Sequence, residues 1–427
     1  MREDLLHFVW KYKKLQLEDL FTSKGETVTI LDVGFHNYLA GPDFFNAKVK
    51  IHNQVWAGNV EIHLKSSDWY AHGHEKDPSY NNVILHVVWE DDIDIFRKDN
   101  SELPTLELRS YITTDVIQAY KTLFDKKDIS YINCEREIGK IDSFLLGNWL
   151  ERLYFERLEQ KSDLVKHLMA RSKNDWEQVL FLLLLKNFGS KINGDSFLSI
   201  GKAVDFSIVR KISQNAFQLE SVLMGLAGLL QPDSDADLYH QELKKEYRYL
   251  QNKFNLTAIG VQQPDFFKLR PLNFPTIRLS QLANLYAKQP NLFSQIIEAS
   301  TLDAVYDIFQ IEASSYWTTH FTFGKSSGKN KKKLTKSFVD LIVINTILPL
   351  KFCYGQETGT EVNEDIVKII SGLKKERNRV ILNFEDFGVN VKSAMDSQAI
   401  LQLFNAYCSK NKCLQCAIGT RLLNGNS

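Results

Sequence analysis

The chain has 427 residues, with 52 basic (Lys and Arg) and 52 acidic (Asp and Glu) side chains, so its formal net charge is zero. This balance argues against a highly basic nucleic-acid coat protein and against an acidic tail, although it is compatible with a local basic cleft. With 44% hydrophobic residues, 24% charged residues and only 9 prolines, we expect two or three folded domains with long helices over much of the chain.

Cysteine usage and hydropathy indicate the compartment. Five cysteines are too few for a disulfide framework in a chain of this length. The N-terminal sequence has no apolar stretch long enough for a signal peptide, and no run reaches the ~18 apolar residues of a membrane span. The longest apolar segments, 179–185 and 341–350, are expected to be buried helices. We therefore expect a soluble, cytoplasmic protein without a membrane partner, and the oligomeric state stays open.

The first 125 residues have a mixed helix and strand pattern. Apolar side chains at helical spacing predict a helix from Glu3 to about Leu20. Alternating or β-branched segments predict strands, with a polar loop or short helix at 66–81 before the last of them. The predicted strands are residues 27–33, 47–52, 55–65 and 82–90. The expected order is thus helix, three strands, loop or helix, and strand.

After Cys134 the pattern becomes helical. A capping box from Asn174 to Glu177 is predicted to open a helix that stops at Gly189. Predicted helices cover residues 176–187, 219–230, 238–255, 281–292, 303–309, 337–350, 363–379 and 397–408. The loop 324–336 carries six lysines and no acid; it fails the Walker pattern and is expected to be a solvated loop or a contact to a nucleic-acid backbone. We predict an α/β domain at 1–125 and a helical domain with a cysteine-rich tail at 126–427.

The strongest chemical signal lies in residues 41–69. Asp43 sits at a turn before a predicted hairpin, and Glu61 lies on the returning strand. His63 and Lys65 follow Glu61 on the same strand face, because side chains alternate with period two. Two converging carboxylates suit Mg²⁺ or Mn²⁺, so we expect Asp43 and Glu61 to bind such a metal and Lys65 or His63 to act on the attacking water. A solvated strand edge without chemistry is the alternative.

A histidine-rich segment follows that strand. His72 and His74 flank Gly73, which lets the backbone turn between the two imidazoles, and Asp77 lies close behind. Paired imidazoles near an acid suit Zn²⁺ or acid–base catalysis, and a loop-structuring role is the alternative. His86 alternates with apolar residues and is predicted to be a satisfied core histidine. We favour one shared site built from Asp43, Glu61, His63, Lys65, His72 and His74.

Three cysteines cluster near the end of the chain. Cys408, Cys413 and Cys416 follow the spacing C-x4-C-x2-C, and the last pair has the knuckle spacing in which two thiolates share one tetrahedral metal. A fourth ligand would have to come from Cys353, from Cys134 or from a histidine, if the fold brings one near. The predicted role is a structural zinc site, with an iron–sulfur cluster and unligated thiols as alternatives.

The N-terminal motifs resemble a known superfamily. An acid after a turn, followed by Glu-x-x and a basic residue on a strand, is similar to the PD-(D/E)XK nucleases, as is the predicted helix–strand–strand–strand–helix–strand order. The resemblance implies a restriction-endonuclease-like domain in which Asp43 is the first acid of the motif and Glu61 the second. His63 occupies the position of the motif's lysine, and Lys65 lies one strand period further on.

A second resemblance spans nearly the whole chain. The phrases GPDF, GNVEIH, SSDW, HGH, YNNVILHVV, RPLNFP, SQAILQL and YCSKNKCLQCAIG together resemble the bacterial domain-of-unknown-function family 2851. That resemblance implies membership and carries little about mechanism.

Together these observations predict a metal-dependent phosphodiesterase or nuclease acting on nucleic acid. A non-catalytic scaffold or nucleic-acid adaptor that retains a degenerate nuclease fold is one alternative. A zinc-dependent hydrolase that uses His72, His74 and a carboxylate is another.

Overall fold

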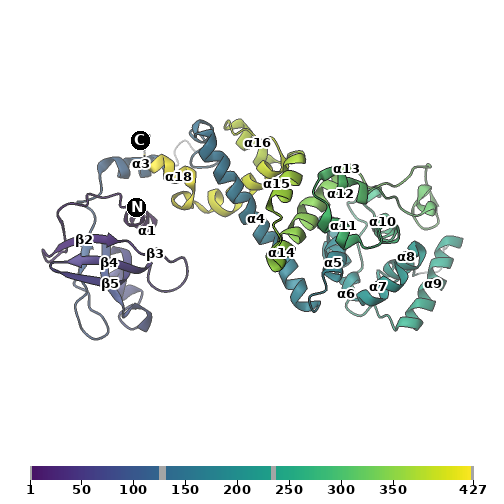
Figure 1. Cartoon of the computed structure of the whole chain (residues 1–427), viewed down its shortest axis with the longest axis horizontal. Helices are drawn as coiled ribbons and strands as arrows, with labels where there is room; N and C mark the ends of the chain where they lie inside the picture. The colour runs from purple at the N-terminus through teal and green to yellow at the C-terminus, as the bar shows by residue number, and fades with distance from the viewer. Residues whose placement is uncertain (1, 125–130, 232–236, 425–427) are drawn as a thin grey trace. The chain divides into compact units, whose positions relative to one another are not determined.

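The computed structural model of the protein describes residues 2–124, 131–231 and 237–424 (Figure 1). Spatial contacts divide the chain into two compact units. Unit 1 consists of residues 1–149, 383–389 and 403–427, and unit 2 consists of residues 150–382 and 390–402. The predicted domain boundary between residues 125 and 126 lies outside the described residues. The second unit is therefore inserted into the sequence of the first.

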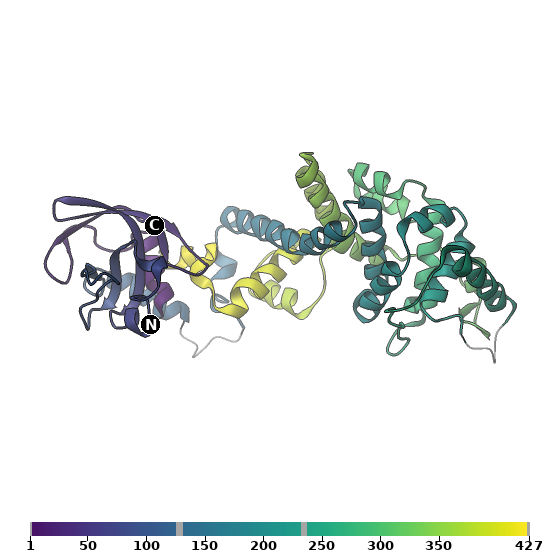
Figure 2. The same ribbon diagram turned by 90° about the horizontal axis from the view of Figure 1, so that it is seen from below.

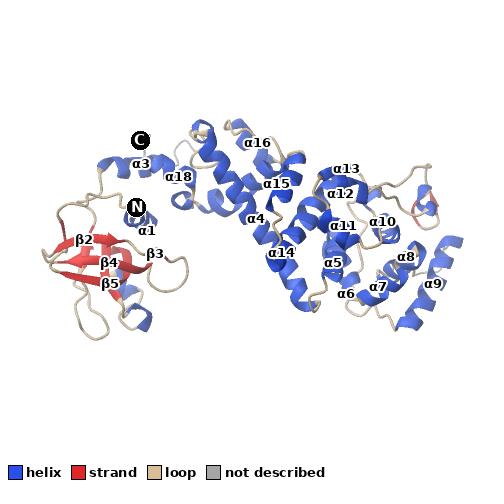
Figure 3. Ribbon diagram, in the orientation of Figure 1, coloured by secondary structure: helices blue, strands red, loops and turns tan. Residues whose placement is uncertain are grey.

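Strands concentrate in the N-terminal region and helices dominate the rest of the chain, as Figure 3 shows. This confirms the predicted order of a mixed α/β region followed by a mostly helical part. The strands of the main sheet are β1 (Leu20–Phe21), β2 (Thr27–Asp32), β3 (Phe35–His36), β4 (Phe44–Ile51), β5 (Gln54–Lys65), β6 (Val83–Glu90) and β7 (Thr105–Glu107). Their spatial order is β1-β2-β4-β5-β6-β7, and β3 pairs with β4.

The sheet is mixed because β4 runs antiparallel to both of its neighbours, whereas β5, β6 and β7 are parallel to one another. On β4 the side chains of Ala47, Val49 and Ile51 are buried and those between them are exposed, as the alternation predicts. A tight turn then joins β4 to β5, and His52 adopts a left-handed φ of 52° there. The buried half of β5 lies between β4 and β6 in the middle of the sheet.

Helix α1 (Glu3–Lys11) is shorter than predicted. The sequence favoured a helix to about Leu20, but the backbone turns at Lys13, whose φ is 49°. Leu15 is buried beyond the turn, and the next residue's backbone N–H donates to the carbonyl oxygen of Tyr111 at 2.8 Å. The apolar side chains that continued the helical spacing therefore contact the core from an irregular segment.

The rest of unit 1 is helical and includes the chain's C-terminal tail. Its short elements are α2 (Asp68–Ala71), η1 (Pro78–Tyr80), α3 (Thr114–Phe124), η2 (Ile138–Lys140), η6 (Leu403–Tyr407), η7 (Cys408–Lys410), η8 (Cys413–Gln415) and α18 (Ala417–Leu423). Helix α18 packs against α3, and both views of the ribbon place the tail beside it (Figures 1 and 2). The segments 114–124 and 417–423, far apart in sequence, thus share one core.

The remaining helices lie wholly or partly in unit 2. They are α4 (Ser143–Arg171), α5 (Trp176–Phe188), α6 (Ser190–Lys202), α7 (Phe206–Ile212), α8 (Ala216–Leu226), α9 (Leu238–Phe254), η3 (Pro271–Asn273), α10 (Pro275–Lys288), α11 (Leu292–Glu298), α12 (Leu302–Ile308), η4 (Ser315–Thr318), α13 (Lys336–Ile342), η5 (Val343–Ile347), α14 (Leu348–Thr358), α15 (Asn363–Gly372), α16 (Arg379–Asp386) and α17 (Ala394–Gln402). A small hairpin, β8 (His320–Thr322) and β9 (Lys325–Ser326), partly occupies the predicted lysine-rich loop.

Several predicted helix ends are wrong for identifiable reasons. The N-cap of α5 is Asp175, whose carboxylate accepts from the Gln178 N–H at 3.0 Å, and not Asn174. Helix α10 begins at Pro275, six residues before the predicted start at 281, because proline fits the first helical position. Helix α15 ends at Gly372, before the predicted end at 379.

The helical stretch Lys336–Thr358 is long and apolar enough to cross a membrane by length and composition alone. However, 78% of its most apolar window is buried inside the protein, and the core helix of a soluble protein passes the same test. It is therefore weak evidence for a span, and the predicted buried helix at 341–350 is confirmed.

The core of unit 2 also holds a buried carboxylate. Glu220 on α8 is fully buried and accepts four side-chain hydrogen bonds. The three with ordinary lengths come from the Tyr239 hydroxyl at 2.9 Å, the Ser280 hydroxyl at 2.8 Å and the Trp317 indole at 2.7 Å, and the fourth comes from the Ser314 hydroxyl. Burial raises its pKa, while these four donors oppose that rise.

Candidate functional site

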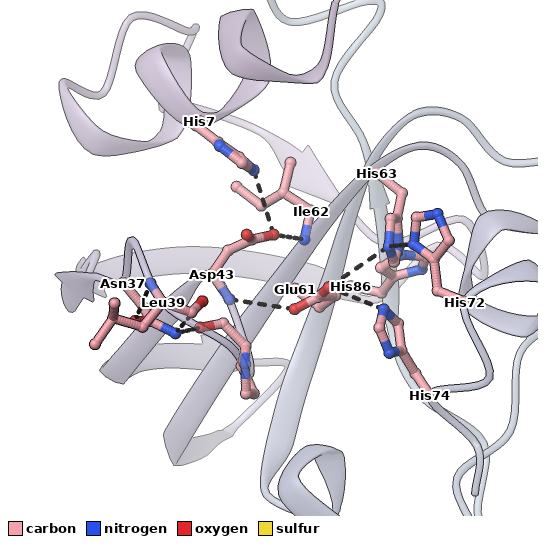
Figure 4. Close-up of polar contacts among 11 residues, drawn as sticks. His7, Asn37, Leu39, Asp43, Glu61, Ile62, His63, His72, His74 and His86 are labelled. Carbon is pink, nitrogen blue, oxygen red and sulfur yellow. Dashed lines mark hydrogen bonds and ion pairs between the residues drawn. The ribbon is translucent and has the colours of Figure 1, made fainter. Parts of the chain in front are cut away.

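The two predicted carboxylates lie beside each other at the junction of β4 and β5 (Figure 4). The backbone N–H of Asp43, just before β4, donates to Glu61 Oε2 at 3.2 Å. In return the N–H of Ile62 donates to Asp43 Oδ2 at 2.9 Å. The register between the strands shifts between Phe44 and Ala47, so the start of β4 approaches β5 out of step with the rest of the hairpin. The predicted proximity of Asp43 and Glu61 is thus realised through backbone hydrogen bonds.

Two histidines contact the Glu61 carboxylate, and a third contacts one of these two. His63 comes from β5 itself, and its Nε2 lies 3.5 Å from Glu61 Oε1. His74 approaches from the loop after α2, with Nε2 at 3.2 Å from the same oxygen. His72 lies 3.1 Å from His63 Nε2 through its Nδ1. Gly73 separates the two loop histidines with a φ of +73°, as the predicted turn requires.

The ligand atoms of His63, His72 and His74 all lie within 4.8 Å of one another, a separation at which one metal ion could be shared. Glu61 and His63 are nearly inaccessible, with 4% and 2% of their surface exposed, whereas His72 is exposed. The cluster is therefore closed by the sheet on one side and reaches solvent on the side of His72.

A second layer of side chains holds the histidines in place. His63 Nδ1 lies 2.7 Å from Nε2 of His86, a buried residue of β6. The Tyr80 ring stacks on His74 with ring centroids 3.8 Å apart, and the Trp69 ring meets the edge of the same imidazole. The Trp69 indole N–H donates to the Phe96 carbonyl oxygen at 3.2 Å. Such outer partners fix the tautomer and orientation of a ligating histidine.

On the other side of the carboxylates, α1 contributes His7. Its Nε2 lies 3.3 Å from Asp43 Oδ2. Burial opposes protonation of His7, but the hydrogen bond and the charge of Asp43 outweigh burial and raise its pKa. Burial also raises the pKa of Glu3 on the same helix to about 7, with the charge of Asp43 adding to the effect. Helix α1 thus continues the polar network toward the chain's first residues.

Burial shifts the pKa values of the central groups toward their neutral forms. The pKa of Glu61 rises to about 9, first through burial and then through the charge of Asp43. Burial lowers the pKa of His63 to about 3, and the neighbouring imidazoles of His74 and His72 lower it further. The pKa of His74 is lowered by burial, and that of His86 falls well below its ordinary value for the same reason. At neutral pH the cluster therefore holds a protonated carboxyl among neutral imidazoles.

One imidazole nitrogen of the cluster faces a carboxylate without making a hydrogen bond to it. His74 Nε2 is buried and lies 3.2 Å from Glu61 Oε1, yet it has no hydrogen-bond partner among the described residues. A nitrogen and an oxygen that lie close together without a shared proton have the relation of two ligands of one cation.

Comparison with known proteins identifies the family. A family profile described as "Protein of unknown function (DUF2851)" matches residues 3–379. The chain belongs to the DUF2851 family. No curated protein and no solved structure matches it. The family resemblance is confirmed. The family's function is unknown, so membership does not indicate the chemistry of this DUF2851 protein.

Among the predicted site residues of the DUF2851 chain, Lys65 is placed differently from the others. Its side chain is 51% exposed, and Nζ lies 4.0 Å from Glu90 Oε1. Its backbone N–H donates to the Asp68 carboxylate at 3.0 Å, so the residue shapes the turn into α2. Lys65 is thus a half-exposed residue at the last position of β5, with its ammonium group beside Glu90.

Two residues of the site were not assigned a role from sequence. His86 was predicted to be a satisfied core histidine; it is buried, but its Nδ1 has no partner among the described residues and its Nε2 contacts His63. The parallel register pairs Glu61 with His86, which strand pattern alone does not reveal. His7 was only one of many N-terminal histidines. Its position near the start of an amphipathic helix did not indicate that it would contact Asp43.

The predicted cysteine ligands lie elsewhere in unit 1. Cys408, Cys413 and Cys416 line a separate small cavity together with Cys134. All five cysteines of the DUF2851 chain are free of disulfides.

Proposed function

We propose that this protein is a metal-dependent hydrolase that holds its metal with Glu61, His63, His72 and His74. The observation that carries the proposal is the trio His63, His72 and His74, whose ligand atoms all lie within 4.8 Å of one another, with Glu61 beside two of them. The separations between neighbouring donor atoms are 3.1, 3.2 and 3.5 Å. A tetrahedral ion with ligand distances of about 2.0–2.1 Å needs donors roughly 3.4 Å apart. These three contacts thus have separations close to those between ligands of a single first-row divalent ion.

The donor set favours a transition metal over magnesium. Imidazole nitrogens suit zinc and its neighbours, whereas magnesium prefers oxygen ligands and retained water. This departs from the expected Mg²⁺ or Mn²⁺ pair at Asp43 and Glu61, because Glu61 directs an oxygen at His63 and His74 whereas the Asp43 carboxylate contacts His7. Asp43 instead orients Glu61 through its backbone N–H and uses its own carboxylate on Ile62 and His7.

Each residue of the network has a part in this chemistry. A bound divalent ion lowers the pKa of its water toward neutrality and polarises a substrate oxygen. When His63 carries its proton on Nδ1, His86 Nε2 accepts a hydrogen bond from it, which leaves His63 Nε2 free to ligate. The Asp43 N–H holds one oxygen of Glu61 and leaves the other for the imidazoles. The exposed side of His72 is where water and substrate would enter.

The substrate class we propose is a phosphodiester of nucleic acid. Support comes from the longer elements α1, β2, β4, β5, α2 and β6, whose order, with the two-residue strands β1 and β3 set aside, agrees with the helix–strand–strand–strand–helix–strand pattern of the nuclease resemblance. It also comes from Asp43 at the start of β4 and Glu61 on β5, in the places of the two acids of the PD-(D/E)XK motif. His63 at the lysine position would make this a variant in which an imidazole ligand replaces the lysine.

The test joins metal analysis with a cleavage assay. The purified chain is analysed for zinc, manganese and iron, and assayed on single- and double-stranded DNA and RNA with Zn²⁺, Mn²⁺ or Mg²⁺. Glu61→Gln and His74→Ala should lose the metal and the cleavage. His167→Ala is the matched control, since that histidine is exposed on α4, and it should retain both.

The outcomes separate the alternatives. Cleavage that requires a transition metal and fails in Glu61→Gln would support the hydrolase. A metal lost in both variants without cleavage of any nucleic acid would contradict the substrate class. A folded wild type that binds no metal would overturn the proposal and favour a non-catalytic scaffold or adaptor.

A further inference from the structure

The four cysteines of unit 1 gather around one cavity. Cys134 lies between α3 and η2, whereas Cys408, Cys413 and Cys416 lie in the C-terminal tail, yet all four line the same space of about 10 Å³. That volume is about the room of one water-sized sphere. None of the four forms a disulfide. The fold thus brings a fourth thiol to the three whose spacing predicted a metal site.

The other candidate for a fourth ligand is accounted for elsewhere. Cys353 belongs to α14 of unit 2, and its buried thiol donates to the Ser162 carbonyl oxygen at 3.7 Å. It therefore serves packing, and it provides a matched control for experiments on the other four cysteines.

Local geometry presents the three tail cysteines to the cavity. Asn411 adopts a left-handed φ of 52° and reverses the chain between Cys408 and Cys413. The Cys416 N–H then donates to the Cys413 carbonyl oxygen at 3.1 Å and closes a tight turn. A Cβ at Gly419 would lie 2.1 Å from that same oxygen, so only glycine lets α18 pack against the turn. The turn between the two cysteines is thereby held in one conformation.

Amide groups point at the sulfur atoms of this turn. The Asn133 side chain donates from Nδ2 to Cys413 Sγ at 3.3 Å. The backbone N–H groups of Ile418 and Gly419 donate to the sulfur of Cys416. Hydrogen bonds of this kind favour the thiolate over the thiol, and the thiolate is the form that ligates metals.

We propose that Cys134, Cys408, Cys413 and Cys416 form a four-thiolate metal centre that joins the tail to the segment after α3. Four sulfurs at about 2.3 Å from zinc lie roughly 3.8 Å apart. Among the described residues, the histidine trio is the group of potential ligands whose donor atoms all lie within 4.8 Å of one another. The four sulfur atoms are therefore not all within 4.8 Å of one another. They would close around one zinc ion or hold the larger iron–sulfur cluster, two occupants with the same ligand chemistry.

The experiment is arranged to be independent of the histidine cluster. The full chain carrying His72→Ala and His74→Ala, which removes the other proposed metal site, is purified with added zinc and, separately, reconstituted anaerobically with iron and sulfide. Zinc, iron and acid-labile sulfide are then measured per chain. Cys134→Ser and Cys416→Ser are compared with Cys353→Ser in the same background.

We expect one zinc ion, or iron with stoichiometric sulfide, that is retained in Cys353→Ser and lost in Cys134→Ser and Cys416→Ser. Zinc alone would assign the single-ion site, and iron with sulfide would assign the cluster. Metal retained in Cys134→Ser, or no metal under either condition, would overturn the proposal.

A second measurement covers the case in which the cysteine variants fail to fold. Wild-type protein is alkylated with iodoacetamide before and after chelation, and the modified cysteines are identified by mass spectrometry. Protection of Cys408 and Cys413 that chelation abolishes would support the centre. Equal labelling in both states would contradict it, since both residues are only partly buried.

Discussion

Glu61 in unit 1 and Glu220 in unit 2 are both buried glutamates, but their partners differ in kind. Glu220 accepts hydrogen bonds from four side chains, those of Tyr239, Ser280, Ser314 and Trp317. Glu61 accepts a backbone N–H from Asp43 and then faces His63 and His74, the latter through a nitrogen that makes no hydrogen bond.

The difference separates a structural carboxylate from a candidate ligand. A buried carboxyl with a full set of donors is satisfied by the protein alone. A buried carboxyl beside bare imidazole nitrogens is satisfied only when a proton or a cation is shared among them. Burial and a raised pKa, which the two residues have in common, therefore do not identify a site, whereas the type of partner does.

The largest effect should come from removing the satisfied carboxyl. Glu220→Ala leaves four buried donors without this acceptor, and each buried polar group left unsatisfied costs about 1–3 kcal/mol. We expect a large loss of stability in urea unfolding followed by circular dichroism, with the metal content of the folded fraction unchanged. Glu312→Ala, which removes an exposed ion pair with Lys331, is the control and should change little. A stable Glu220→Ala protein would contradict the structural role of the Glu220 carboxyl.

An outer partner of the proposed ligands should have the next largest effect. His86→Phe removes the acceptor that orients His63, and loss of such a partner typically reduces metal affinity about 10–100-fold. Competition with a fluorescent zinc chelator measures this directly. The exposed-surface control His167→Ala should bind as the wild type does, and an unaltered affinity in His86→Phe would remove His63 from the ligand set.

Titration of Glu61 should decide whether the stability of the protein rises or falls with pH. Its pKa is about 9 in the folded chain against an ordinary value of 4.5, so the folded state binds the extra proton and its stability falls as pH rises between these values. His63, with a pKa of about 3 against 6.5, has the opposite sign and acts only below pH 6.5. The melting temperature of chelator-treated protein should therefore fall from pH 6.5 to pH 9.

Glu61→Gln provides the control for that pH dependence, because the amide does not titrate. The fall in melting temperature above pH 6.5 should be smaller in the variant, and at pH 9 the metal-free variant should be at least as stable as the wild type. Added zinc should offset the fall in the wild type alone, since the ion takes the place of the proton. An equal pH dependence in both proteins would contradict the raised pKa of Glu61.

The smallest effect should come from Lys65. Its ion pair with Glu90 is half exposed, and pairs of this kind contribute about 0–1 kcal/mol. Lys65→Ala should unfold within that range of the wild type and should bind metal with the same affinity. If the variant kept its metal but lost cleavage, the lysine would have a catalytic role, as the nuclease resemblance implies.

More of this site than of its surroundings could be predicted from the sequence. Period-two alternation places Glu61 and His63 on one strand face, and Gly73 permits the turn between His72 and His74, so these residues could be found locally. His86 could not, because its contact depends on the parallel register between β5 and β6, which shifts between Asn59 and Val60. Side-chain pattern specifies the face of a strand but leaves its partner undetermined.

Local sequence patterns also failed to predict tertiary contacts near both ends of the given sequence. The predicted strands and the change to a helical pattern follow from spacing over a few residues and are largely confirmed. The extension of the first helix to about Leu20 failed because Lys13 turns the backbone while Leu15 remains apolar and buried. The meeting of Cys134 with the tail depends on tertiary folding, and no local pattern could reveal it.

The insertion of unit 2 within unit 1 has a consequence for synthesis on the ribosome. Asn133 and Cys413, which share a hydrogen bond, are 280 residues apart. At about 5–20 residues per second, the N-terminal segment waits roughly 15–60 s for the tail that completes its core. During that interval the surface of α3 that α18 will cover is exposed on the nascent chain, which makes it a candidate for chaperone protection. Unit 1 can therefore complete its core only after the inserted unit has been made.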